Sequence, residues 1–211
     1  MNILAAVLLG LADEYSVETL KEAPPADVAE AVRKELAGEG VRILKDKKPF
    51  ADYWLRKSVP TQAPSGQIGI LYGMIRPGTL LAAVRVHAGS SDYRGFKVGA
   101  GAYTLRYGVQ PEDGDHQGTA ENRDFLILSP AAADPSPEVM KQDDVYKLSS
   151  KVTGKKHPAV AYVIKGVEGD KLPRLIHEED KERWILECET SQAPNGKPLR
   201  LWIVVVGKAP E

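Results

Sequence analysis

Oxygen-bearing side chains alternate along residues 113–124 in the spacing that a calcium loop uses. Calcium takes about six to eight oxygen ligands, and a loop of about twelve residues can supply them if it turns sharply near its middle. Set against such a loop, Gly118 falls at the position of the turn. The ligands predicted by this alignment are Asp113, Asp115, Gln117, Thr119, Glu121 and Asp124. Calcium is therefore the one cofactor that the sequence suggests.

This segment also departs from the EF-hand pattern. Gln117 stands where an Asp or Asn is usual, and Asp124 stands where a bidentate glutamate closes the loop. The flanking residues alternate like strands, whereas an EF-hand has helices on both sides. The alternative is a solvated acidic hairpin loop, because Asp, Gly and Asn are common turn formers.

Other chemical motifs are absent or incomplete. The four histidines, His87, His116, His157 and His177, are too widely spaced for a local metal motif. Cys188 is the only cysteine, so no intramolecular disulfide can form, and we expect this residue to be buried in a strand. The sequence has no nucleophile elbow, phosphate loop or dinucleotide loop. A hydrolase with a dispersed acidic site stays open, because carboxylate pairs are defined in space and not by sequence spacing.

Two segments are rich in aromatic residues. Rings with a polar edge can stack on sugars when neighbouring polar groups bind the hydroxyls, so carbohydrate is a predicted ligand. In the alternative interpretation the rings fill the core, because Tyr103 and Tyr107 share one face of a strand. The residues concerned are Phe50, Tyr53 and Trp54 in the first segment, and Tyr93, Phe96, Tyr103 and Tyr107 in the second.

The composition is that of an ordinary globular protein. Of the 211 residues, 43% are hydrophobic and 27% are charged, which is compatible with a sizeable core. The formal net charge of −1 provides no field that would attract nucleic acid, so we expect no nucleic-acid partner. The 19 glycines and 15 prolines fit a fold with many turns.

The elements that must position these residues are mostly short strands. Apolar segments bounded by turn residues recur at close spacing, and Asn195-Gly196 is a strong hairpin signal. Helices are predicted over residues 25–37, where Val28, Val32 and Leu36 share a face, and over residues 137–148, with Ser136 as the cap. The predicted strands cover residues 41–44, 51–59, 67–75, 79–87, 103–107, 124–128, 159–165, 183–190 and 199–206.

This pattern predicts a mainly β fold. No regular alternation of strands and helices is present, which argues against a parallel sheet with helical crossovers. We expect a two-sheet antiparallel β-sandwich, jelly-roll or immunoglobulin-like, with one or two short helices. A β-barrel is the alternative.

The N-terminal residues predict export. Residues 3–12 read ILAAVLLGLA, which has the length of the apolar region of a secretory signal and is too short to span a bilayer. Gly10 and Ala12 supply the small residues of a cleavage site. The alternative is a buried first strand or helix. We expect residues 1–12 to be a signal peptide or apolar segment, residues 13–211 to form a single β-rich domain, and the protein to be periplasmic or extracellular, without a transmembrane segment.

One stretch carries a resemblance. Residues 98–105 read VGAGAYTL, which resembles the glycine-led G-x-Y-T-L start of a strand in many exported bacterial β-sandwich domains. With Asp113-Gly114-Asp115-His116 and Arg123-Asp124-Phe125, the run looks like uncharacterised exported bacterial proteins with no assigned activity. The resemblance implies a sandwich and export, and it transfers no catalytic residue.

Together these observations predict a noncatalytic exported binding or structural module. Its expected ligand is a carbohydrate or another component of the cell envelope. Two alternatives stay open: a calcium-stabilised module that uses residues 113–124, and a hydrolase with a dispersed acidic site.

Overall fold

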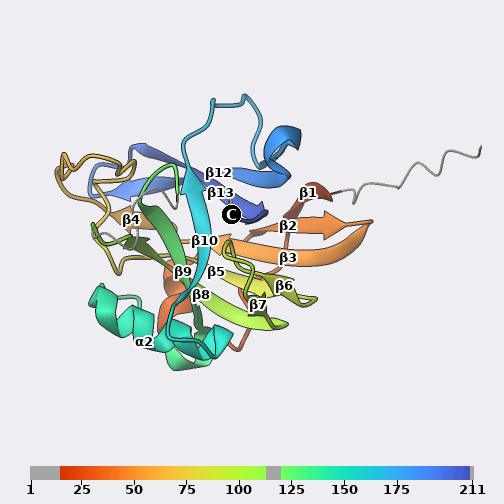
Figure 1. Ribbon diagram of the computed structural model, residues 1–211, viewed down its shortest axis with the longest axis horizontal. Helices are drawn as coiled ribbons and strands as arrows, with labels where there is room; N and C mark the ends of the chain where they lie inside the picture. The colour runs from red at the N-terminus through yellow and green to blue at the C-terminus, as the bar shows by residue number, and fades with distance from the viewer. Residues whose placement is uncertain (1–14, 113–119, 210–211) are drawn as a thin grey trace, which may run out of the picture.

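The computed structural model describes residues 15–112 and 120–209, and most of the regular structure in these residues is strand. Eleven of the described strands form one hydrogen-bonded sheet (Figure 1). Across the sheet their order is β1 (Tyr15–Leu20), β2 (Gly40–Lys45), β3 (Lys48–Leu55), β5 (Leu80–Val86), β8 (Gly101–Val109), β9 (Asp124–Pro130), β10 (Ala159–Ile164), β13 (Pro198–Val206), β12 (Arg183–Ala193) and β11 (Arg174–Glu178), with β4 (Ser58–Pro60) beside β12. Strands β6 (Ser90–Ser91) and β7 (Lys97–Val98) form a separate small sheet.

The large sheet curls at β10, which changes partner along its length. Residues 159–162 pair with β9, whereas Val163 and Ile164 pair with β13. In Figure 1 this strand runs from the part of the sheet near the second helix up to β13 and β12. Side chains satisfy two of its carbonyls near the change of partner: Asn122 Nδ2 donates to Val163 O at 3.0 Å, and the Tyr72 hydroxyl donates to Ile164 O at 3.0 Å.

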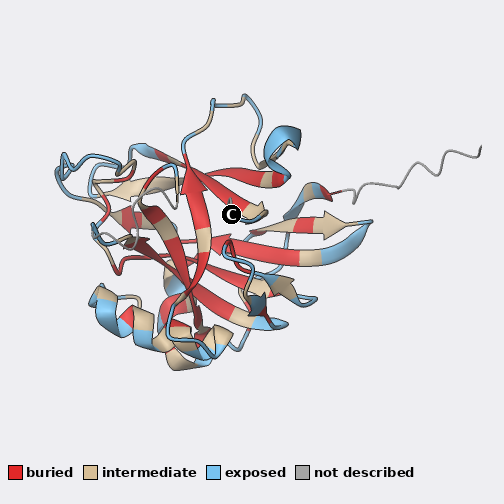
Figure 2. Cartoon of the chain, viewed as in Figure 1, coloured by how far each residue is buried: buried red, intermediate tan, exposed pale blue. Residues whose placement is uncertain are grey.

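The curl brings the two ends of the sheet close together. The ring of Tyr15 on β1 lies 5.4 Å, centroid to centroid, from the ring of Trp184 on β12. The concave side holds the main core, in which Leu105 and Leu126 meet Leu201 and Ile203 from the other half of the sheet. Figure 2 shows that the strands are buried mainly along their central parts. The predicted mainly β class is confirmed; the sheet is a half-barrel with a small second sheet and does not separate clearly into two sandwich layers.

The first helix, α1 (Glu30–Glu35), lies within the predicted range but is shorter. The backbone of Ala29 is extended, with ψ of 143°, so the helix begins only after it. Leu36 is also extended and forms a bridge with Arg56, which ends the helix. Val28, Val32 and Leu36 are buried against Trp54 and other residues on the convex face of the sheet, so the predicted apolar face is confirmed.

The second helix, α2 (Gln142–Thr153), starts five residues later than Pro137 and also ends later than predicted. The Ser136 hydroxyl accepts a hydrogen bond from the backbone N–H of Glu138, as a cap would. However, the buried guanidinium of Arg106 takes the carbonyl oxygens of both Ser136 and Glu138 as acceptors. These carbonyls therefore bond to a side chain and not to a following helical turn. The short helix η1 (Ala131–Ala133) precedes this segment.

The predicted strand over residues 67–75 is wrong. This segment consists of turns and irregular backbone, and only Ile75 makes an isolated bridge, with Thr61. The backbone N–H groups of Leu71 and Tyr72 donate to the carboxylate of Asp124, at 2.8 and 2.9 Å. A buried carboxylate thus satisfies backbone donors that a neighbouring strand would otherwise have to satisfy.

A buried ion pair fixes the connection between β9 and α2. Arg106 and Asp134 have fully buried side chains, and they bond through Nε–Oδ2 at 2.7 Å and Nη2–Oδ1 at 2.8 Å. Arg106 Nη1 also donates to Gly78 O at 2.7 Å. Gly78 has φ of +88°, and a Cβ there would lie 1.7 Å from the carbonyl oxygen of Met140. The pair therefore joins the turn before β5, strand β8 and the segment before α2.

Replacement of Asp134 by asparagine should strongly destabilise the protein. The change preserves shape but leaves the buried Arg106 charge uncompensated, which costs about 3–5 kcal/mol in comparable buried pairs. Denaturant unfolding followed by circular dichroism measures the loss. As a control, Glu30→Ala removes an exposed pair with Lys34 on α1 and should cost less than about 0.5 kcal/mol. A cost for Asp134→Asn as small as that of the control would contradict this role.

Candidate functional site

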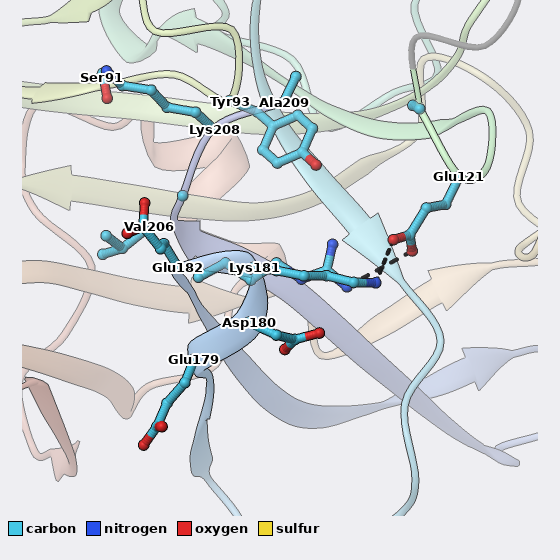
Figure 3. Close-up of a pocket in the computed structure, with 13 residues that line it drawn as sticks. Ser91, Tyr93, Glu121, Glu179, Asp180, Lys181, Glu182, Val206, Lys208 and Ala209 are labelled. Atoms are coloured by element: carbon cyan, nitrogen blue, oxygen red, sulfur yellow. Dashed lines mark hydrogen bonds and ion pairs between the residues drawn. The ribbon is translucent and has the colours of Figure 1, made fainter. Parts of the chain in front are cut away.

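A large cavity lies where β12 begins and β13 ends (Figure 3). Its volume is about 970 Å³. The short helix η2 (Glu179–Lys181) forms one side, and Glu121, which precedes β9, faces it across the cavity. The lining residues are Ser91, Tyr93, Ala120, Glu121, Glu179, Asp180, Lys181, Glu182, Arg183, Val206, Gly207, Lys208 and Ala209.

An ion-pair network joins the two sides of this cavity. Lys181 Nζ lies 2.5 Å from Glu121 Oε1, and Arg183 Nη2 lies 3.7 Å from Glu121 Oε2. Figure 3 shows the Lys181 side chain directed toward the Glu121 carboxylate. The hydrogen bond from Lys181 lowers the pKa of Glu121 below its ordinary value, and Arg183 adds to this effect although partial burial opposes it. Glu121 is thus held as a carboxylate.

Arg183 is the most buried charged residue of the network. Its side chain is only 5% exposed, and its Nε donates to Glu178 Oε2 at 2.7 Å. Burial would lower the pKa of Arg183, but Glu178 and Glu121 outweigh that effect and raise it. Arg183 therefore supplies a fixed positive charge between two carboxylates, whereas Lys181 and Glu121 are about half exposed and can contact a ligand.

Tyr93 lines the cavity, and Tyr162 packs against it. The rings of Tyr93 and Tyr162 are stacked, with centroids 4.6 Å apart. The Tyr162 hydroxyl accepts a hydrogen bond from the backbone N–H of Asn122 at 2.8 Å. Burial raises the pKa of Tyr93, and it raises that of Tyr162 to about 12, so both phenols are neutral at physiological pH. The stacked ring of Tyr162 therefore holds the Tyr93 ring in place.

Glu121 does not meet the requirement for the general acid of a glycosidase pair. Such a pair needs one carboxylic acid with a raised pKa facing a second carboxylate. The two cations lower the pKa of Glu121, which is the opposite of what a general acid requires. Glu179 points away from Glu121 in Figure 3. Glu121 is therefore in the wrong protonation state for a general acid, and as a carboxylate it can accept hydrogen bonds from a polar ligand.

The predicted calcium ligands fall partly outside the described residues. Asp113, Asp115, Gln117 and Thr119 lie there, as does His116. Glu121 forms the ion pairs given above. Asp124 is fully buried, and besides Leu71 and Tyr72 its carboxylate accepts a hydrogen bond from the Tyr107 hydroxyl at 2.7 Å. The calcium loop stays a prediction, and an ion at Asp124 would have to compete with these three donors.

The aromatic residues lie in the described ranges, and each is buried or partly buried. Trp54 and Trp202 are buried in two outer clusters. Trp184 is half-buried, and one face of its indole is covered by the His177 ring, whose centroid is 4.2 Å away. The expected row of exposed rings is thus not found among the described residues, because packing of the convex face and of the concave core takes up the aromatic surface.

Several charged residues that sequence reasoning passed over form structural pairs. Asp52 is fully buried and binds Arg42 through two hydrogen bonds and His87 Nε2 at 2.7 Å. Glu187, also fully buried, pairs with Arg174 and Arg200. Within residues 15–112 and 120–209, no three His, Cys, Asp or Glu side chains are grouped so that they could hold a metal ion. In the same residues, no helix is long and apolar enough to cross a bilayer.

The lining residues Lys181, Arg183 and Lys208 were not predicted as site residues, whereas Tyr93 was among the aromatic residues named as candidates for sugar binding. Tyr93, the Lys181–Arg183 pair and Lys208 lie in three segments that no local spacing connects. Comparison with known proteins adds no family: no protein-family model, curated protein or solved structure matches this chain.

Cys188 should not react with thiol reagents in the native protein. It is buried in β12, as expected, and burial raises the pKa of its thiol to about 12. Since the thiolate is the reactive form, a colorimetric disulfide reagent at pH 8 should label the native protein only as fast as the protein unfolds. Addition of denaturant should expose one thiol per chain at once. Rapid stoichiometric labelling without denaturant would contradict the buried position.

Calcium should raise the melting temperature if the loop over residues 113–124 binds it. A ligand that binds only the folded state stabilises it by about 2.7 kcal/mol when present at a hundred times its dissociation constant. The measurement compares melting in millimolar calcium and in a chelator. The double variant Asp113→Asn with Asp115→Asn should abolish the shift, whereas Asp170→Asn, an exposed change elsewhere, should not. The same melting temperature in calcium and in chelator would contradict the predicted calcium site.

Proposed function

We propose that this protein is an exported, noncatalytic binding module, and that the cavity around Glu121, Lys181 and Arg183 binds a hydroxyl-rich ligand such as a carbohydrate of the cell envelope. The observation that carries the proposal is the combination of size and polarity in one cavity. Its volume of about 970 Å³ is at the upper end of the range of about 300–1,000 Å³ that is usual for ligand sites.

The chemistry of the lining supports a polyhydroxylated ligand. Carboxylates from Glu121 and Asp180 accept hydrogen bonds from hydroxyl groups, and Lys181 and Lys208 donate to hydroxyl oxygens. Both signs of charge are present, so a neutral ligand meets donors and acceptors without a net repulsion. Because no Phe, Tyr or Trp ring in residues 15–112 and 120–209 is fully exposed, recognition here depends on charge-assisted hydrogen bonds and not on stacking.

The noncatalytic part rests on the state of the acids. Glu121, which pairs with Lys181 and Arg183, is held ionised, so it is not available as a general acid. Export is supported by the apolar residues 3–12, which lie outside the described residues. The binding site and the compartment are therefore separate parts of the proposal.

Binding to envelope polysaccharides and their oligosaccharides should depend on Lys181. Isothermal titration with a panel of such glycans should identify a binder, and the double variant Glu121→Gln with Lys181→Gln should weaken it about tenfold or more, since hydrogen bonds to charged groups contribute about 1.5–3 kcal/mol. Lys171→Gln, an exposed lysine that does not line the cavity, is the matched control and should bind like the natural protein.

Two results would overturn the proposal. One is equal affinity of the double variant and the natural protein for the glycan, which would show that the glycan binds outside this cavity. The other is release of reducing ends from the bound glycan, which would show catalysis.

A further inference from the structure

A second, smaller cavity lies between α2 and the adjoining ends of β8, β9 and β10. Its volume is about 210 Å³. Most of its surface is apolar, and three basic side chains stand around it. The lining residues are Arg94, Gly108, Val109, Gln110, Pro111, Phe125, Ile127, Tyr146, Lys156, His157, Pro158 and Val160. None of them lines the larger cavity at the start of β12, so the two sites are distinct.

We infer that this cavity is a binding site for a small carboxylate with an apolar body. The first argument is the rim, where the guanidinium of Arg94 and the ammonium of Lys156 carry positive charge and the imidazole of His157 lies beside them. Lys156 and His157 are exposed, and their side chains have no hydrogen-bond or ion-pair partner among the described residues. Two unpaired basic groups beside an apolar surface favour a ligand that has an anionic end and an apolar end.

Arg94 is held in place by its own contacts. It donates from Nη2 to the carbonyl oxygen of Pro158, and its guanidinium lies over the ring of Phe96 at 5.1 Å. Its acidic neighbour Asp92 is 3.7 Å away, but the carboxylate of Asp92 also accepts the backbone N–H groups of Phe96 and Val160. Asp92 is fully buried behind Arg94, so it does not face the cavity as a competing anion.

The remaining polar groups of the wall are neutral and already bonded. The Tyr146 hydroxyl accepts a hydrogen bond from Gln142 Nε2 at 2.8 Å. Burial raises the pKa of Tyr146 to about 12, so the phenol carries no charge that would repel a carboxylate. Gln142 itself bonds to both the N–H and the C=O of Val109. The side chains of Phe125, Ile127 and Val160 give the cavity an apolar floor. The backbone N–H and C=O of Val109, which also lines the cavity, are already hydrogen-bonded.

The size of the cavity limits the ligand. At about 30 Å³ per water molecule, 210 Å³ has room for about seven waters, so a ligand of about seven to ten non-hydrogen atoms fits. Benzoate has this size, one carboxylate and a flat apolar body. Benzyl alcohol has nearly the same shape without the charge. The two compounds separate the contribution of the basic rim from that of the apolar floor.

The test is a titration of the isotopically labelled full chain with benzoate and with benzyl alcohol at neutral pH, followed by amide chemical shifts in NMR spectra. Benzoate should shift the resonances of Val109, Tyr146 and Val160. Benzyl alcohol should bind about twofold to fivefold more weakly, the difference that a partly exposed charge pair gives. Lys156→Gln should weaken benzoate by a similar factor and leave benzyl alcohol unchanged.

Lys151→Gln is the matched control, because Lys151 is an exposed lysine of α2 that does not line the cavity. It should bind benzoate like the natural protein. Three results would overturn the inference: shifts that cluster at the larger cavity, equal affinity for both compounds, or unchanged benzoate binding in Lys156→Gln. Since the two cavities share no lining residue, the outcome does not depend on whether the larger one binds a glycan.

Discussion

The fold depends on the way β10 divides its hydrogen bonds between two strands. Its first four residues bond to β9, and its last two bond to β13. A strand that changes partner exposes backbone groups at the change, and buried backbone groups need partners. Asn122 and Tyr72 supply them from different loops. Because these bonds can be made, one continuous sheet can curl and enclose a core from both halves.

Buried carboxylates then fix the loops onto this sheet. Asp124 holds the turn at Leu71 and Tyr72, and Asp134 holds Arg106, which in turn holds the segment before α2. Such charges would be costly if unpaired in the interior. Each is satisfied by several donors, so they act as structural links between segments that are far apart in the sequence. By contrast, Glu121 and Asp180 at the larger cavity are exposed and available to a ligand.

The sequence predicted the strands well where alternation was strong, as in β8 and β13, and where turn residues were distinctive, as at Asn195-Gly196. Edge strand β11 was missed because only two of its residues, Leu175 and Ile176, are apolar. The false strand at residues 67–75 has a non-local cause, since Asp124 lies more than fifty positions away. The lining of the larger cavity could not be predicted from the sequence for the same reason. No periodicity connects Tyr93 to Arg183, and only the curl of the sheet brings them together.

The pairing of β4 with β12 has a consequence for the order in which the chain folds. Ser58 lies beside Ser191, and the core under β3 and β5 is covered by residues of β12 and β13. During synthesis, the first half of the chain therefore emerges without the strands that must cover it, and contacts between such distant residues form slowly. The core of the first half of the sheet is therefore completed only when the last strands of the chain have been made.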